Sequence, residues 1–237
     1  MKSSFKEDQV YIFNQHKILI FYSAKCGNTT LRQWYLHFTQ NKLIENVDQL
    51  RIKTNHLIKK EFSSKYNLGL CDKYLKSIVV RNPYYRVVSM FMDKFIFKQD
   101  NVSDTLSQGN ITFNNFLQLL LEERDKYNFE LTDKHFIPQS LSREKLKFNY
   151  IIKLESFERD MLDFIHKEID SNYNYDFTKK AGNFESSYNY EDHQSLTNVR
   201  LSELRKKDSI NKKSFLDNST KPIIFNIYKN DFIKFNY

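Results

Sequence analysis

The ten residues SAKCGNTTLR, numbered 23–32, decide the fold of this chain. They follow the apolar run Ile18–Tyr22, which has the length and composition of a short buried strand. Beyond the run, apolar side chains recur at the spacing of one face of an amphipathic helix: Leu31, Trp34, Tyr35 and Phe38. The stretch therefore predicts a strand that enters a tight loop and a helix that begins where the loop ends.

The predicted loop has the chemistry of an anion-binding site. Unpaired backbone N–H groups and the positive end of the helix dipole meet at a helix start, and both attract phosphate. Gly27 lets the backbone approach a ligand closely, and Lys25 supplies a mobile positive charge. Two hydroxyl groups follow, at Thr29 and Thr30. The loop lacks the Gly-x-x-x-x-Gly-Lys-Ser/Thr pattern of nucleotide triphosphatases, so an ordinary strand–turn–helix with a solvated lysine is the alternative for this stretch alone.

A second strand and helix follow the same plan. Lys76–Val80 is another apolar strand candidate, and Pro83 suits the first turn of a helix. The apolar stripe of that helix consists of Tyr84, Val88, Phe91 and Phe95. Arg86 and Ser89 are three residues apart and share a different face of the helix.

Arg81 stands at the carboxyl end of this second strand, which is where open α/β sheets bind ligands. A strand-end arginine and a helix serine, Arg81 and Ser89, together predict a second anion pocket. Two anion pockets on one edge of a sheet predict a ligand that carries two separated phosphates.

Both stretches, SAKCGNTTLRQW and IVVRNPYYRVVSMFMDKF, resemble the paired cofactor signatures of carbohydrate sulfotransferases, the chondroitin, dermatan and uronosyl group. Shorter matches follow at DKHFIPQ, YIIKLESFERD and IYKNDFIKFNY, so the resemblance extends from Ile18 to Tyr237. The resemblance implies an enzyme that uses 3′-phosphoadenosine 5′-phosphosulfate (PAPS) as its sulfuryl donor. It assigns the 5′-phosphosulfate to the first loop, residues Lys25, Cys26, Gly27, Asn28, Thr29 and Thr30. It assigns the 3′-phosphate to Arg81 and Ser89, and it implies a hydroxyl acceptor, with a glycan expected.

The catalytic base is predicted by position. In related sulfotransferases the base, usually His or Glu, follows a strand between the two cofactor motifs, and His56 is the candidate there. Leu50–Thr54 alternates like a short half-buried strand, which would place His56 at its end, just before a Lys-rich helix. His135 competes, because Pro138 favours extended backbone before it and this stretch borders the acceptor pocket in the family. A surface or capping role for His56 and a hydrogen-bonded core role for His135 are the alternatives.

The remaining patterns complete an α/β fold. Thr112–Tyr127 predicts a helix capped by Thr112, Asn149–Leu154 a third buried strand, and the chain after Pro222 a final helix. We expect one domain over residues 1–237, with a P-loop-like, three-layer arrangement. Its central parallel sheet would have roughly four or five strands, flanked by helices on both faces.

Composition limits the partners. The net charge of +8 suits nucleic acid, an anionic lipid surface or small anionic ligands, but the lysines are scattered rather than gathered in one basic run. The first residues contain no apolar segment of membrane-spanning length, so we expect no membrane anchor, unlike Golgi relatives.

Two cysteines, Cys26 and Cys71, are too few for a disulfide framework, and Asn28–Thr30 would be a glycosylation sequon inside the loop. Both observations favour the cytoplasm.

Two other classes of protein compete with the sulfotransferase. A nucleotide or small-molecule kinase could use the same strand–loop–helix, but it needs a metal-binding Asp after a strand and a fuller glycine-rich loop. A non-catalytic nucleic-acid-binding protein would fit the charge, but no recognition-helix or aromatic-basic sheet motif supports it. The six histidines show no metal-ligand spacing, so no metal is expected. No signal indicates an oligomeric state.

Four basic residues near the end of the sequence are candidates to close over the phosphates: Arg200, Arg205, Lys212 and Lys213.

Overall fold

A computed structural model describes residues 10–63, 73–97, 111–129, 133, 135–144, 146–177 and 194–237. Its contacts divide the chain into two compact units. The first unit comprises the described residues of 1–81 and 142–184, and the second those of 82–141 and 185–237. The single domain predicted over residues 1–237 stays a prediction. Cys71 lies outside the described residues.

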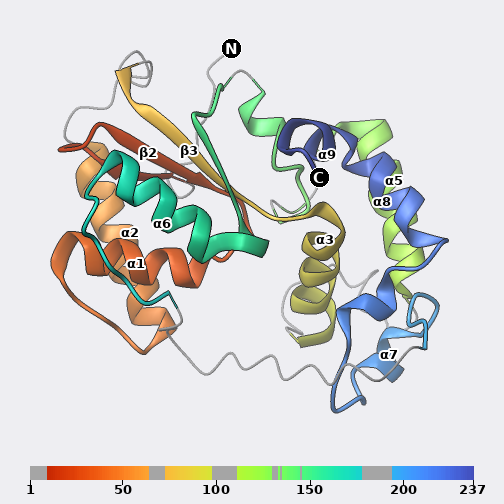
Figure 1. The fold of residues 1–237 in the computed structure, drawn as a ribbon. Coiled ribbons are helices and arrows are strands. Elements are labelled where there is room, and N and C mark those ends of the chain that lie inside the picture. The colour runs from red at the N-terminus through yellow and green to blue at the C-terminus, as the bar shows by residue number, and fades with distance from the viewer. Residues whose placement is uncertain are drawn as a thin grey trace. The chain divides into compact units, whose positions relative to one another are not determined.

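The first unit contains a four-stranded sheet with the order β1-β2-β3-β4 (Figure 1). The strands are β1 Val10–Phe13, β2 Ile18–Tyr22, β3 Leu75–Val80 and β4 Tyr150–Lys153. Three of the four predicted strands are confirmed as strands, and β2, β3 and β4 pair in parallel. The third, β4, is less buried than predicted, since Ile151 is 40% exposed. The expectation of a parallel sheet is wrong for β1, which pairs antiparallel with β2. The reason is the short turn over residues 14–17, since a parallel connection needs a crossover of a dozen or more residues.

Helices α1 Asn28–Gln40 and α6 Phe157–Glu168 pack on the sheet in one apolar cluster. The strands contribute alternate residues to this cluster, which is the pattern of one sheet face: Tyr11 and Phe13, Ile18, Ile20 and Tyr22, Val79, and Ile152. The predicted stripe of α1 is confirmed, because Leu31, Trp34 and Tyr35 are all buried there. The α/β class is therefore confirmed.

Helix α2, Val47–Ser63, corrects a prediction. Leu50–Thr54 was expected to be a strand, but it lies within α2, which packs against α1 and β1. The alternation over five residues was misleading, because the buried residues of the longer segment are Leu50, Thr54 and Ile58, spaced four apart. Ile52, which a strand would have buried, is 65% exposed. The helical period, repeated from Leu50 to Ile58, outweighed a local period of two.

The second unit is built from helices around an aromatic core. Its helices are α3 Pro83–Phe91, α5 Phe113–Tyr127, α7 Leu201–Leu204, α8 Thr220–Ile227 and α9 Lys229–Phe235. A π-helix, η3 Met92–Phe97, continues α3, and a 3-10 helix, η6 Lys212–Phe215, precedes α8. Helix α8 packs against α3 and α5. The core rings include Phe91, Phe95, Phe113, Phe116 and Phe215.

Two predicted helix starts in the chain agree with the structure: Thr112 caps α5 in a reciprocal capping box with Asn115, and Pro83 is the first residue of α3. The single final helix expected after Pro222 is instead two helices, of which α8 begins at Thr220, two residues before Pro222. Two further 3-10 turns, η4 Leu141–Arg143 and η5 Leu154–Ser156, flank β4. Within the described ranges, no helix combines the length and the hydropathy needed to cross a bilayer.

Candidate functional site

The loop between β2 and α1 has an unusual backbone. Lys25 has φ 66° and Gly27 has φ 74°, both in the left-handed region, whereas Cys26 between them does not. Alternation of this kind turns successive backbone N–H groups toward one side, which is the geometry of an anion-binding nest. Two observations explain the glycine at position 27. Its φ is one that other residues rarely adopt, and a Cβ there would lie 2.6 Å from Leu154 Cδ1. The loop predicted from the sequence is therefore present.

Helix α1 begins without a side-chain cap. Its N-cap is Gly27, which has no side chain, and its first turn contains no acidic residue. The first intrahelical hydrogen bond runs from Leu31 N to Gly27 O at 3.0 Å. The N–H groups of Asn28, Thr29 and Thr30 consequently have no acceptor within the helix, and the dipole adds positive potential at the same place.

Two arginines hold the loop by its oxygens. Arg81 Nη1 donates to Lys25 O at 3.2 Å. Arg143 is buried, and it donates from Nη1 to Ser23 Oγ at 2.7 Å and from Nη2 to Tyr22 O at 2.6 Å. Arg81 was predicted in a second anion pocket with Ser89, and its binding of a far phosphate stays a prediction. The sequence reasoning missed Arg143, which lies in no motif and reaches the loop across more than a hundred residues.

A cleft of about 1050 Å³ opens beside the first turn of α1 in the same unit. Its lining includes Thr30 from α1, Leu154 and Glu155 from η5, Phe157 and His166 from α6, and Phe177. Apolar and aromatic side chains therefore line the cleft together with charged ones, which include Glu158, Arg159 and Asp163. A ligand bound to the loop through a phosphate has room there for a bulkier apolar part.

His56, the first candidate for the base, lies in the middle of α2 and not at a strand end. Its side chain is exposed. The residue two positions earlier, Thr54, is buried and accepts a hydrogen bond from Arg32 Nη1 of α1 at 2.6 Å. Residues two apart point to opposite sides of a helix, so His56 faces away from α1. Its position gives the predicted role no support, and that role stays a prediction.

Ser89 and His135 belong to the second unit. Ser89 lies on α3 and is half-buried. Since Arg81 belongs to the first unit, the predicted pairing of Arg81 with Ser89 stays a prediction. Arg86, on the same helix, is buried and donates from Nη2 to the backbone oxygens of His135 at 3.0 Å and Ile137 at 2.9 Å.

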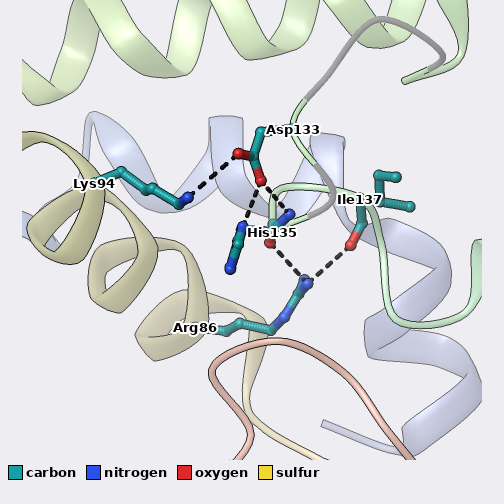
Figure 2. Close-up of polar contacts among 5 residues, drawn as sticks. All are labelled: Arg86, Lys94, Asp133, His135 and Ile137. Carbon is teal, nitrogen blue, oxygen red and sulfur yellow. Dashed lines mark hydrogen bonds and ion pairs between the residues drawn. The ribbon is translucent and has the colours of Figure 1, made fainter. Parts of the chain in front are cut away.

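His135 is paired with a carboxylate, as Figure 2 shows. Its Nδ1 lies 2.5 Å from Asp133 Oδ1, and its backbone N–H donates to the same oxygen at 2.8 Å. Lys94 Nζ, from η3, lies 3.3 Å from Asp133 Oδ2. Burial alone would raise the pKa of Asp133, but the hydrogen bonds from His135 and the charges of His135 and Lys94 outweigh burial and lower the pKa to about 2. Asp133 is therefore ionised at neutral pH.

Arg205, one of the four basic candidates near the end of the chain, has a structural contact. Arg205 donates from Nε and Nη2 to Phe95 O, at 3.1 and 2.9 Å, and so holds the π-helix η3. A role for Arg200, Lys212 or Lys213 over phosphates stays a prediction.

Comparison with known proteins agrees with these motifs. Residues 8–237 match the model of the "Sulfotransferase family". The curated relatives include carbohydrate sulfotransferase 10 from Rattus norvegicus and Mus musculus, each 29% identical over 102 residues, and from Homo sapiens, 28% identical over 102 residues. Each alignment covers 40% of this chain and 28% of the relative.

No solved structure matches the chain significantly. The family match nevertheless covers nearly all of the sequence, and the resemblance to carbohydrate sulfotransferases is confirmed by relatives of that name. The chain belongs to the sulfotransferase family.

Proposed function

We propose that this protein transfers a sulfuryl group from PAPS to a hydroxyl group of a glycan. The observation that carries the proposal is the uncapped start of α1, where left-handed Lys25 and Gly27 precede three N–H groups with no acceptor in the helix. An anion completes such a helix start. The names of the relatives, carbohydrate sulfotransferase 10, support a carbohydrate acceptor. A P-loop-like, three-layer organisation around the loop is part of the same proposal and rests on the family resemblance.

The residues of the first unit fit the donor. PAPS, when bound, supplies the sulfuryl group and a bisphosphate leaving group. The loop N–H groups and Lys25 would stabilise the charge that develops on the leaving phosphate, while Thr29 and Thr30 would orient it. Because Arg81 and Arg143 already fix the loop oxygens, these donors need little rearrangement when the charge develops.

The cleft beside Thr30 fits the rest of such a donor. An adenine ring would pack against Leu154 and the exposed edges of Phe157 and Phe177, which line the cleft beside three carboxylates, Glu155, Glu158 and Asp163. Arg81 and Ser89 would bind the 3′-phosphate, and this assignment rests on the family resemblance. The acceptor hydroxyl must lose its proton during transfer, and His56 and His135 are the two candidates for the base.

The test combines ligand binding with turnover. The purified chain is melted with 3′-phosphoadenosine 5′-phosphate, with ATP–Mg²⁺ and with a DNA oligomer, because a ligand of the native state raises the melting temperature. Stabilisation by the 3′,5′-bisphosphate, together with transfer of labelled sulfate from PAPS to glycan acceptors, supports the proposal. Stabilisation by ATP–Mg²⁺ alone would favour a kinase, and stabilisation by DNA alone a nucleic-acid-binding protein.

A matched pair of lysines links the loop to turnover. Lys25→Ala removes the cation from the loop, whereas Lys59→Ala removes an exposed lysine from α2. We expect Lys25→Ala to lower kcat on the order of 100-fold, which is the usual effect of losing one electrostatic stabiliser. Lys59→Ala should leave kcat unchanged. Equal kcat values for the two variants would show that Lys25 of the loop takes no part in the reaction.

A further inference from the structure

Lys25 has a backbone conformation that L-residues disfavour. Its φ is 66°, in the left-handed region, although it is not a glycine. An L-residue prefers right-handed backbone to this one by roughly 5- to 30-fold, because its Cβ is crowded by the following carbonyl oxygen. A residue persists in such a conformation only where the surrounding structure determines its backbone. The contacts that hold Lys25 therefore decide the shape of the loop.

The peptide unit between Lys25 and Cys26 is held at both of its polar atoms. Arg81 Nη1 donates to the oxygen of this unit, Lys25 O, at 3.2 Å. The nitrogen of the same unit, Cys26 N, donates to Ser23 O at 3.3 Å. The two hydrogen bonds fix the plane of this peptide unit, and one of them depends on where Ser23 lies.

Arg143 fixes Ser23. The guanidinium donates from Nη1 to Ser23 Oγ at 2.7 Å and from Nη2 to Tyr22 O at 2.6 Å. Arginine presents its donors in a rigid fork, so two bonds from one guanidinium set an orientation as well as a distance. Arg143 is 3% exposed and Ser23 is 4% exposed, so little water reaches these bonds. A chain of contacts thus runs from Arg143 through Ser23 to the peptide unit that follows Lys25.

We propose that Arg143 is a positioning residue for Lys25. Through Ser23 it keeps the Lys25 backbone left-handed, so that the lysine and the loop N–H groups are preorganised for the anionic end of the donor. This inference rests on the proposed sulfuryl transfer, since it assigns the loop to the 5′-phosphosulfate. All the residues that carry it belong to the first unit.

Loss of Arg143 should lower the affinity of the loop for its ligand. Without the contact to Ser23, residue 25 relaxes toward the conformations that L-residues prefer, and only the left-handed fraction binds. The apparent affinity falls in proportion to that fraction, so Arg143→Met should weaken binding of 3′-phosphoadenosine 5′-phosphate by roughly 5- to 30-fold. Calorimetry well below the melting temperature of each variant measures this change in the folded protein.

A glycine at position 25 gives the sharpest test. Lys25→Gly and Lys25→Ala both remove the ammonium group, but glycine adopts positive φ about as readily as negative φ. Arg143→Met should therefore weaken the bisphosphate by about tenfold in the Lys25→Ala protein and by at most about twofold in the Lys25→Gly protein. Equal losses in the two proteins would overturn the inference, because the effect of Arg143 would then not pass through the backbone of residue 25.

The conformation of Lys25 can also be measured without a ligand. The ¹³Cα and ¹³Cβ chemical shifts of a residue depend on its φ and ψ, so backbone NMR reports the left-handed conformation directly. We expect left-handed shifts for Lys25 in the native protein and their loss in Arg143→Met. Arg143→Lys keeps a positive charge but lacks the fork, so it should behave like Arg143→Met. Native shifts and native affinity in Arg143→Lys would show that the charge acts alone, against a positioning role.

An arginine elsewhere in the first unit supplies the matched control. Arg32 Nη1 donates to Thr54 Oγ1 at 2.6 Å and to Asn55 Oδ1 at 2.7 Å, both on α2. Arg32→Met should leave the Lys25 shifts and the bisphosphate affinity unchanged. Left-handed Lys25 shifts that persist in a folded Arg143→Met would overturn the inference. If the native protein binds no bisphosphate, the proposed function fails, while the Lys25 shifts still decide the role of Arg143.

Discussion

The Gly27→Ala substitution tests the construction of the loop with one methyl group. Gly27 has φ 74°, and placing an L-residue in that region costs roughly 1–2 kcal/mol. The new Cβ would also lie 2.6 Å from Leu154 Cδ1, so Leu154 must leave its rotamer at a cost of order 0.5–1.5 kcal/mol. Together these terms lower the free energy of unfolding by roughly 1.5–3.5 kcal/mol.

For a chain of this size, such a loss lowers the melting temperature by roughly 3–14 °C. Thermal melting measures that change, and titration with the 3′,5′-bisphosphate measures the additional loss of affinity from the displaced N–H groups. The double variant Gly27→Ala, Leu154→Ala separates the two causes. It removes the clash but keeps the strained φ, so the two substitutions should couple favourably by about 1 kcal/mol in a double-mutant cycle. If Gly27→Ala melts and binds like the native protein, the reasoning about the loop is refuted.

Other residues give shorter tests. Arg143→Ala should lower the free energy of unfolding by roughly 1–3 kcal/mol because it leaves buried loop oxygens without their donor, and unchanged melting would contradict that role. Ser89→Ala should weaken binding of the 3′,5′-bisphosphate but not of a nucleotide without the 3′-phosphate, as calorimetry can show. Arg81→Ala should weaken binding of the bisphosphate about tenfold and, because Arg81 also holds Lys25 O, should weaken binding of the second nucleotide to a smaller extent. Because the pKa of Asp133 falls from 3.8 to about 2, its stabilising contribution is complete above the unfolded value and is lost as the pH falls through the folded value. The difference in melting temperature between native protein and Asp133→Asn should thus shrink between about pH 4 and pH 2, and a constant difference would argue against the ion pair. His56→Ala should retain the native kcat. A fall in kcat of about 100-fold would instead identify His56 of α2 as the base.

Local signals in the sequence predicted much of the first unit. The apolar run Ile18–Tyr22 and the glycine that follows it predicted β2, the loop and α1, because each signal lies within a few residues of the structure it determines. The same holds for the cap at Thr112, which lies beside the helix that it begins. A prediction from five residues was wrong for α2, because its helical period is visible only over the longer segment that contains Leu50, Thr54 and Ile58.

Long-range contacts account for the rest of the differences. Arg143 meets Tyr22 and Ser23 only after the chain has folded, so nothing near it in the sequence marks it. Arg86 was placed with Ser89 by helical spacing, but its burial and its partners at His135 and Ile137 come from a segment about fifty residues away. Spacing predicts which face a side chain occupies, whereas the partner it meets depends on tertiary packing.

The uncapped start of α1 has a consequence for the life of the protein in a cell. A helix whose first N–H groups lack acceptors within the helix is completed by its ligand, so the ligand-free chain has a less stable first unit than the loaded one. Binding to the native state alone adds stability that grows with the ligand concentration, by about 2.7 kcal/mol at a hundred times Kd. Proteases act on the small unfolded fraction, and a difference of this size changes protein abundance several-fold. We therefore expect the amount of this protein to rise and fall with the supply of the donor nucleotide proposed for it.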